Sequence, residues 1–370
     1  MHLTLLTYLS VVFAVARAGA PTIPLDEAIV IGKTNGTVTS YYGIPYAQPP
    51  IDDLRLRLPK PVTAYNGTIN ATVPATQCTQ LPAAPRSDLP TTILQDLLAY
   101  GATIPNSVDV PQSEDCPSHS WEAKKSRKLV SVTLDSTIGL ADSWAPHADG
   151  VFIKAPPQHL VLAGSVANIP FITGDALDEG TVFSTGSFNV TTEDEFRTFV
   201  QQEFFPNTPV DILAPLFDLY PNVASEGSPF ETGNANELYP EFKRMAALQG
   251  DIAFQAPRRF LLDQRSLKQH AWTYTSKRGA IQGLGCPHGS DAVQALALGN
   301  DLSDYVIQFT ATLDPNGGAS NRTIAWPRYD PLARSMFVLL DGDTPLEIVP
   351  DTARLEAMAA LTELTVAYPI

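Results

Sequence analysis

The stretch from Ile169 to Thr181 constrains the fold more than any other part of the chain. It opens with the apolar run Ile-Pro-Phe-Ile, reaches a Gly-Asp pair at 174–175, and then brings further acids at Asp178 and Glu179. An apolar run bounded by a turn signal is typical of a buried strand. The pattern predicts a strand that stops at the Gly-Asp turn and presents an acid at its end.

A histidine follows roughly a hundred residues later, in a turn-forming loop just before an apolar, helix-like segment. The loop reads Gly285-Cys286-Pro287-His288-Gly289. An acid followed at this distance by a histidine is the chain order of the last two members of the triad in α/β-hydrolases. The acidic turn and His288 are therefore candidates for one active site.

The first member of such a triad, a serine within Gly-x-Ser-x-Gly, does not occur in the sequence. Ser290 lies close to His288, and Ser320 follows Gly317-Gly318-Ala319. Neither has the glycines of a strand-turn-helix elbow, so both are interpreted as loop serines. The sequence supplies no nucleophile for the other two groups.

Composition and motifs disfavour several other function classes. With 39 acidic and 24 basic residues, the formal net charge of -15 would repel nucleic acid phosphates. The sequence contains no His-Glu-x-x-His, no Cys-x-x-Cys, no Walker loop and no Gly-x-Gly-x-x-Gly. We therefore expect no metal site and no cofactor. At 370 residues the chain is long enough for one large α/β domain or two ordinary ones.

Residues 1–18 have the pattern of a secretory signal peptide. The run from Leu3 to Ala16 is apolar, and Ala16-Arg17-Ala18 fits a small-x-small cleavage site. The run is too short to span a membrane and no second one follows, so we expect a secreted, extracellular protein without stable membrane insertion. A buried first strand or helix is the alternative. Five Asn-x-Ser/Thr sequons agree with a glycosylating compartment, at Asn35, Asn66, Asn70, Asn189 and Asn321.

The chain has three cysteines: Cys78, Cys116 and Cys286. In an oxidising compartment a bridge from Cys78 to Cys116 would close a Pro-rich loop, with a loop-closure contribution of about 4 kcal/mol before strain. Cys286 is then left unpaired near His288. A Cys-His nucleophilic pair is one alternative there, but residues so close in sequence rarely aim their side chains at one another, so we favour a buried thiol.

Local patterns predict several further elements. Residues 28–32 and 36–42 have the composition of two short strands around a turn. Thr192 and the acids after it predict a helix start, and residues 245–260 show a second helical pattern. Residues 271–275 alternate as a strand does and lead into the loop of His288.

Two N-terminal segments resemble the type-B carboxylesterase/lipase family, the cholinesterase-like branch of the α/β-hydrolases. They are Gly43-Ile44-Pro45-Tyr46-Ala47 and Ser113-Glu114-Asp115-Cys116. In that family the first is a structural signature, and the cysteines matching Cys78 and Cys116 form a disulfide. The sequence departs from the family at Asp52, where a glycine is usual. The resemblance covers residues 26–116 and 144–340, including a signature-like Trp326-Pro327-Arg328-Tyr329.

The resemblance also implies the roles of the site residues. The family motif Gly-x-x-x-Asp-Glu-Gly-Thr matches Gly174 to Thr181, which makes Glu179 the catalytic acid. His288 then takes the place of the catalytic base. Asp175 and Asp178 are interpreted as loop or cap acids.

Residues 117–142 form an atypical junction where the resemblance stops. Family members continue here with a His/Tyr-Gly-Gly-Gly oxyanion loop, central strands and the nucleophile elbow, and the sequence contains none of these motifs. Instead it has a short basic run, Lys124-Lys125-Ser126-Arg127-Lys128. A docking patch or processing site is one interpretation of this run, and a solvated charge run is the one we favour.

Together these observations predict the α/β class, as a single domain over residues 19–370. The expected architecture is an incomplete α/β-hydrolase fold, a mostly parallel sheet with helices on both faces and its central strands missing. Two functions fit. The first is a secreted carboxylic-ester hydrolase family member, catalytically impaired because it lacks the nucleophile, with a small-molecule or lipid ester as substrate if active. The alternative is a non-catalytic, cholinesterase-like binding or adhesion module.

Overall fold

A computed structural model of the chain describes residues 19–36, 38–49, 51–54, 60–73, 77–78, 90–103, 112–113, 148–151, 153–296, 299–317, 324–343 and 345–370. They belong to two compact units, Met1–Pro82 with Ser107–Lys124, and Ala83–Asn106 with Lys125–Ile370. The expected signal peptide and the junction at 117–142 lie outside the described residues. The single domain over 19–370 stays a prediction.

The first unit contains a small mixed sheet in the order β1-β2-β5. Strand β2 (Glu27–Ile31) pairs antiparallel with β1 (Thr22–Leu25) and parallel with β5 (Asn66–Asn70). The strand expected at 28–32 is therefore present. It does not pair with the strand that follows it in sequence, because its two edges already bind β1 and β5.

Two further strand pairs complete the first unit. The hairpin of β3 (Lys33–Asn35) and β4 (Val38–Ser40) turns at Gly36, which has a φ of 61° that favours glycine. The short strands β6 (Gln77–Cys78) and β7 (Gln112–Ser113) pair in parallel.

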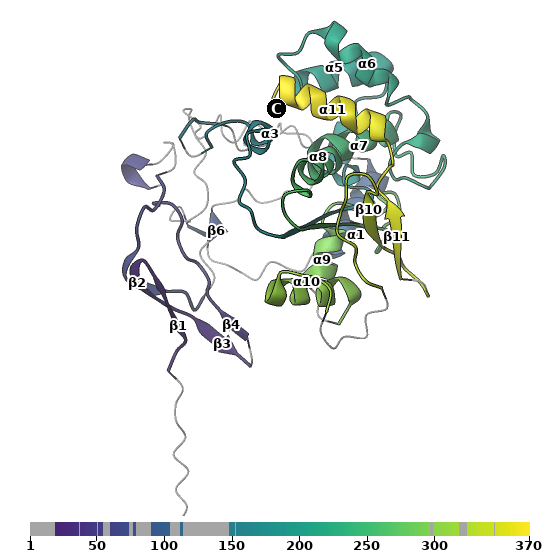
Figure 1. The fold of residues 1–370 in the computed structure, drawn as a ribbon. Helices are drawn as coiled ribbons and strands as arrows, with labels where there is room; N and C mark the ends of the chain where they lie inside the picture. The colour runs from purple at the N-terminus through teal and green to yellow at the C-terminus, as the bar shows by residue number, and fades with distance from the viewer. Residues whose placement is uncertain are drawn as a thin grey trace, which may run out of the picture. The chain divides into compact units, whose positions relative to one another are not determined.

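The second unit is built on a four-stranded sheet in the order β11-β10-β9-β8 (Figure 1). Strand β9 (Ala271–Ser276) pairs in parallel with both β8 (Phe171–Ala176) and β10 (Ser335–Leu339). Only β11 (Leu346–Pro350) is antiparallel to its neighbour β10 among these strands. This confirms the predicted mostly parallel sheet. Every residue of β9 is buried, as expected of a strand covered on both faces.

Helices cover the two faces of this sheet (Figure 1). On one face Leu262 of α8 (Ala256–Arg265) packs with Ala271. On the other, Tyr305 of α10 (Asp301–Thr312) packs with Trp272. Because Ala271 and Trp272 are consecutive in a strand, they point to opposite faces. The prediction of helices on both faces is confirmed.

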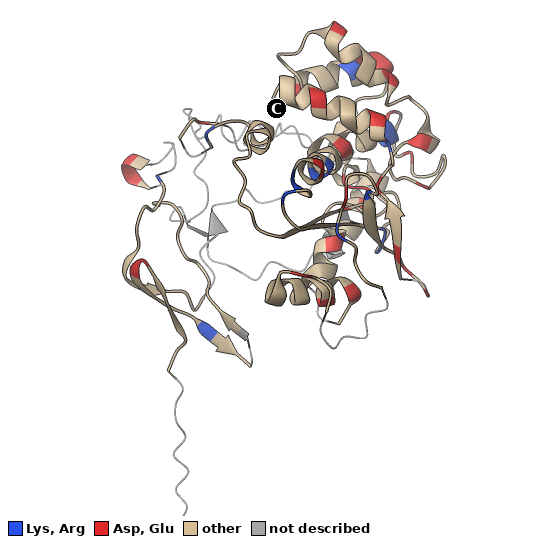
Figure 2. Cartoon of the chain, in the orientation of Figure 1, with Lys and Arg blue, Asp and Glu red and all other residues tan. Residues whose placement is uncertain are grey.

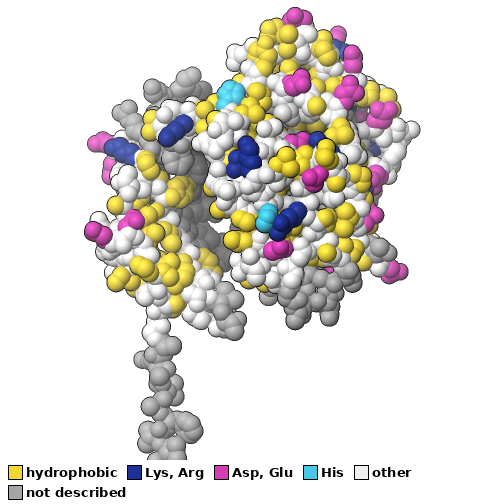
Figure 3. Space-filling view, in the orientation of Figure 1, with side chains coloured by type: hydrophobic (Ala, Val, Ile, Leu, Met, Phe, Trp, Pro, Cys, Tyr) yellow, Lys and Arg dark blue, Asp and Glu magenta, His cyan; other side chains and the backbone are white. Residues whose placement is uncertain are grey.

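A helical layer in the same unit encloses the largest apolar cluster. Its helices are α5 (Glu193–Glu203), α6 (Val210–Asp218), α7 (Phe242–Gly250) and α11 (Leu355–Ala367). Helix α5 starts as predicted, because Thr192 and Glu195 form a reciprocal capping box. Figure 2 shows carboxylates along the outer helices of this layer, and Figure 3 shows acidic and apolar side chains interspersed on the face in view.

The helical pattern predicted for residues 245–260 is also confirmed, with one irregularity. Between α7 and α8 the backbone forms a π-helical segment, Asp251–Gln255. Such segments occur frequently at functional sites. The remaining α-helices are α1 (Thr91–Thr103) and the shorter α3 (Pro157–Leu162), α4 (Thr181–Ser184) and α9 (Ser290–Leu296).

The predicted end of the strand before the acidic turn is wrong. Strand β8 continues through Gly174 and Asp175 to Ala176. Gly174 is needed for packing, since a Cβ there would lie 2.3 Å from the ring of Tyr274 on β9. Asp175 is accommodated in the strand because Arg258 pairs with its carboxylate.

Candidate functional site

The turn after β8 places Glu179 in the interior of the protein. Glu179 is only 4% exposed, and its Oε1 accepts a hydrogen bond from the amide of Ala176 at 2.6 Å. Gly180 follows immediately and caps the N-terminus of α4. The short turn therefore fixes the carboxylate through the hydrogen bond to Oε1 and leaves Oε2 available for a contact outside the turn.

The second oxygen of Glu179 contacts His288. The distance from Nδ1 of His288 to Oε2 of Glu179 is 2.6 Å. Because a carboxylate only accepts hydrogen bonds, Nδ1 carries the proton, and Nε2 has no hydrogen-bond partner among the described residues. The hydrogen bond to Glu179 raises the pKa of His288, while partial burial opposes this shift. The His288 side chain is 42% exposed, so the ring remains accessible.

Two aromatic rings, stacked with 5.9 Å between their centroids, pack on one side of the imidazole of His288. The ring centroids of Phe254 and Phe183 lie 4.8 Å and 5.2 Å from that of His288. Phe254 comes from the π-helical segment and Phe183 from α4, the helix that follows Glu179. The histidine is thus held by an apolar wall on one side of its ring and by a carboxylate at Nδ1.

Sequence reasoning missed several contacts of this site. Neither Phe183 nor Phe254 carries a motif that marks it as a neighbour of His288. Tyr100 of α1 donates a hydrogen bond from its hydroxyl to the carbonyl of His288 at 2.9 Å, and burial, then the charge of Glu179, raise its pKa. These contacts join segments distant in sequence, so no local pattern could have identified them.

The interpretation of Asp175 as a loop or cap acid is wrong. Asp175 lies on β8 and pairs with Arg258, whose Nη1 also contacts Asp351 at 2.9 Å and Thr273 at 2.8 Å. Burial raises the pKa of Asp175 to about 6, with the positive charge of Arg258 opposing. This buried ion cluster lies on the α8 side of the sheet and has no contact with His288. Asp178 lies in the loop as expected.

The structure brings no other nucleophile to His288 among the described residues. Cys286 is a free, buried thiol, as expected, and burial raises its pKa to about 12, so it stays protonated at neutral pH. Ser290 begins α9 and its hydroxyl is buried without a hydrogen-bond partner. Ser320 lies outside the described residues.

The expected modification sites are only partly described. Asn35, Asn66, Asn70 and Asn189 are exposed, as glycosylation requires, whereas Asn321 lies outside the described residues. The expected partner of Cys78, Cys116, lies outside as well. Within the described part of the chain no cluster of three or more His, Cys, Asp or Glu could hold a metal ion. No described helix is both long and apolar enough to cross a membrane.

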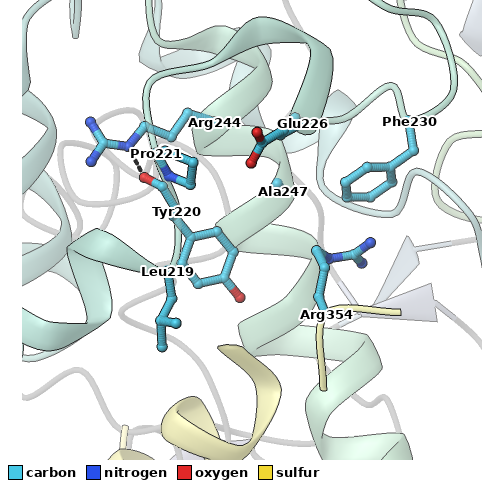
Figure 4. A pocket seen from close by; sticks show the side chains of 9 residues that line it. Leu219, Tyr220, Pro221, Glu226, Phe230, Arg244, Ala247 and Arg354 are labelled. Carbon is cyan, nitrogen blue, oxygen red and sulfur yellow. Dashed lines mark hydrogen bonds between the residues drawn. The ribbon is translucent and has the colours of Figure 1, made fainter. Parts of the chain in front are cut away.

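A cavity of about 320 Å³ lies elsewhere in the second unit, next to the helical layer (Figure 4). Arg244 and Arg354 line it, but both guanidinium groups are already paired. Arg244 donates to the carbonyl of Tyr220 and contacts Glu193, and Arg354 contacts Asp251 at 2.6 Å. Because these two positive charges are compensated within the protein, neither arginine is left free to bind an anionic ligand.

Comparison with known proteins points to esterases and lipases. The sequence profile of the Carboxylesterase family matches residues 20–117. The chain is 37% identical to "Secreted lipase 1" of Botryotinia fuckeliana (strain B05.10) over 207 residues, which are 53% of this chain and 36% of the relative. It is 36% identical to "Lipase 4" of Diutina rugosa over 220 residues, 56% of this chain and 39% of the relative. The matches thus span well under half the length of these relatives.

Solved structures agree on the fold. "Crystal Structure of Aspergillus niger EstA" superimposes with a TM-score of 0.61 at 17% identity, covering 95% of this chain and 99% of that chain. A structure titled "PNB ESTERASE another structure" gives a TM-score of 0.54 at 13% identity, covering 92% and 99%. At these identities the likeness establishes the α/β-hydrolase fold.

Proposed function

We propose that this chain is a secreted carboxylic-ester hydrolase relative with an incomplete catalytic site, because its sequence is similar to carboxylesterases and lipases. One observation carries the proposal. The 2.6 Å hydrogen bond between Glu179 and Nδ1 of His288 leaves Nε2 without a partner among the described residues. This is the arrangement that a catalytic base requires.

The two residues would divide the work as in a serine hydrolase triad. Glu179 would hold the imidazole in the tautomer with the proton on Nδ1 and stabilise the imidazolium. Nε2 of His288 would then take the proton from a nucleophile and return it to the leaving alcohol. The stacked rings of Phe183 and Phe254 would restrict the motion of the imidazole and the access of water on the side that they cover. A small-molecule or lipid ester is the matching substrate class.

The sequence lacks what the first step needs. It contains no Gly-x-Ser-x-Gly serine to attack the carbonyl and no His/Tyr-Gly-Gly-Gly loop to stabilise the oxyanion. In a serine protease, loss of the nucleophile alone lowers turnover about a million-fold. We therefore propose that this chain has little or no esterase activity.

Secretion and its covalent consequences are part of the same proposal. Supporting features are the signal-like residues 1–18, the exposed sequon asparagines, and relatives whose printed names include "Secreted lipase 1". A disulfide from Cys78 to Cys116 follows from the family resemblance. No observation favours the alternative of a binding or adhesion module.

An esterase assay tests the proposed impairment. The full chain is secreted from a eukaryotic host and assayed with a short p-nitrophenyl ester, beside Glu179→Gln and His288→Ala. We expect background turnover in all three proteins. Robust turnover that disappears in both variants would show a working site and overturn the impairment.

The intact mass of the natural, deglycosylated protein tests the sequence behind the proposal, with peptides mapped across residues 113–149. A mass equal to that of residues 19–370 supports a real internal deletion. A heavier product that yields a Gly-x-Ser-x-Gly peptide would contradict it and point to an active esterase with Glu179 and His288 in its triad.

A further inference from the structure

We propose that Asp178 is a positioning residue that holds the histidine loop against the acidic turn and so sets the approach of His288 to Glu179. The inference rests on the proposed function, because it gives Asp178 a role only if that pair is the catalytic one. Asp178 does not touch the imidazole of His288. Asp178 would act through the backbone of the loop that carries His288.

The carboxylate of Asp178 binds two separate segments. Asp178 is only 2% exposed. The hydrogen bonds that its carboxylate accepts come from N–H and O–H donors. Oδ2 accepts a hydrogen bond from the amide of Cys286 at 2.9 Å. Oδ1 accepts from the hydroxyl of Ser228 and from the amide of Phe230, each at 2.8 Å. Burial raises the pKa of Asp178, and these three hydrogen bonds oppose that shift because they favour an ionised, acceptor-only side chain.

The backbone of Asp178 binds the same loop. Its amide donates to the carbonyl of Cys286 at 2.9 Å, and Asp178 also forms a β-bridge with Pro287. Thr181 extends the link, because its hydroxyl lies 2.9 Å from the carbonyl of Asp178 and 2.8 Å from that of Leu284. Asp178 therefore binds both the backbone N–H and the backbone C=O of Cys286.

Gly285 makes this close approach possible. It has a φ of 65°, and a Cβ built on it would lie 2.2 Å from Oδ2 of Asp178. Any side chain at 285 would thus push the loop away from the carboxylate. The glycine preceding Cys286 is required both by its backbone conformation and by the contact with Asp178.

The place of this link explains its proposed effect. Asp178 precedes Glu179 directly, and Cys286 is separated from His288 only by Pro287. Glu179 and His288 share a single hydrogen bond, and the His288 side chain is 42% exposed. One such hydrogen bond does not by itself fix a loop. The buried bonds of Asp178 supply the rigid spacing that the pair lacks.

Asp178→Asn tests the proposal in the full-length protein. An asparagine has one carbonyl oxygen and an NH2 group. On the side of the NH2 group, which only donates, the hydrogen-bond donors that now contact the carboxylate would lose their acceptor. Either the bond from the Cys286 amide or the bond from the Phe230 amide must break, whereas the Ser228 hydroxyl can turn and accept from the NH2 group. The readout is the pKa of His288, followed by NMR and assigned by the resonance lost in His288→Gln. A second readout is hydrogen exchange of residues 284–290, compared with that of β9.

Asp175→Asn is the matched control. Asp175 is similarly buried and lies three residues earlier, but it contacts Arg258 and not the histidine loop. Glu179→Gln marks the effect of losing the pair itself. If Asp178→Asn does not fold, Ser228→Ala is the second variant, because it removes only one donor from Oδ1. We expect Ser228→Ala to change the pKa of His288 and the exchange of residues 284–290 in the same direction, but by less.

We expect Asp178→Asn to lower the pKa of His288 and to speed exchange at 284–290 more than in β9, with exchange at 284–290 unchanged in Asp175→Asn. An unchanged pKa, or exchange that rises equally in both segments, would overturn the positioning role. If instead Glu179→Gln leaves the pKa of His288 unchanged, the pair proposed above fails. The two failures are therefore distinguishable.

Discussion

Gly180 lies in contact with the carbonyl of Ala246, where no side chain fits. A Cβ on Gly180 would lie 2.0 Å from the oxygen of Ala246 and 2.5 Å from the nitrogen of Gly250. The φ of Gly180 is -82°, so its backbone would suit any residue and only the contact demands glycine. The close packing of the acidic turn on α7 thus depends on the residue next to Glu179.

Gly180→Ala should destabilise the protein by about 1–3 kcal/mol, because α7 or the acidic turn must move to admit the methyl group. Urea unfolding followed by circular dichroism measures the change. Gly19→Ala is the control, since no atom lies within 4 Å of its Cβ position. Equal stability of the two variants would show that the turn and α7 can separate without cost.

Arg258→Met should be among the most damaging substitutions in the chain. Arg258 bridges the buried carboxylates of Asp175 and Asp351, with side chains that are 4%, 7% and 2% exposed. Its removal leaves Asp175 as a buried acid without a cationic partner, whereas Asp351 keeps its pair with Arg259. We expect a loss of about 3–5 kcal/mol in the free energy of unfolding.

The control for this prediction is Lys277→Met. Lys277 pairs with Glu231 at 2.6 Å, but the Glu231 side chain is 65% exposed. Solvent-screened pairs contribute at most about 1 kcal/mol. Denaturant unfolding of both variants gives the comparison, and a similar loss in both would contradict the importance we assign to burial.

The pair of Glu179 and His288 should make stability depend on pH. The pKa of His288 is raised in the folded state above its ordinary value of 6.5, chiefly by the hydrogen bond to Glu179. The stability from this pair is therefore fully present below pH 6.5 and is lost as the pH rises through the folded-state pKa. We expect wild type to exceed Glu179→Gln in stability most at acidic pH.

The measurement is the free energy of unfolding of both proteins at several pH values on either side of 6.5. Asp175 also has a raised pKa, chiefly because of burial, and the charge of Glu179 contributes to it, so the comparison is repeated in an Asp175→Asn background. A difference that stays constant, or grows toward alkaline pH, would rule out the protonated histidine as the stabilised form.

Thr181→Val should weaken the link between the acidic turn and the histidine loop. The buried hydroxyl of Thr181 serves the carbonyls of both Asp178 and Leu284, and valine keeps its shape without the donor. We expect a loss of about 1–3 kcal/mol because buried polar groups are left unsatisfied.

Thr362→Val serves as the control for Thr181→Val. The Thr362 hydroxyl bonds the carbonyl of Met358 at 2.8 Å within the regular helix α11. That carbonyl can keep a backbone partner, so we expect a loss below about 0.5 kcal/mol. Thermal melts of both variants compare the two losses of stability. An equal shift in Tm would count against a special role for Thr181.

Several elements of the fold were predictable because their signals are local. Thr192 with Glu195 predicted the start of α5, since a capping box needs only residues within one turn. The apolar run before Glu179 predicted β8, although not its end. Gly174 looked like a turn residue, and only the ring of Tyr274 above it explains why glycine is required there.

The sequence by itself determined the acidic turn, the histidine loop after it, and the absence of a nucleophile motif, because these are properties of short segments and their order. Only the tertiary structure decided that Glu179 and His288 meet, and that Tyr100, Phe183 and Phe254 surround the histidine. The same holds for Asp178, which binds the loop of Cys286. Contacts between segments so far apart in sequence depend on how the strands and helices pack together, and local preference carries no information about that packing.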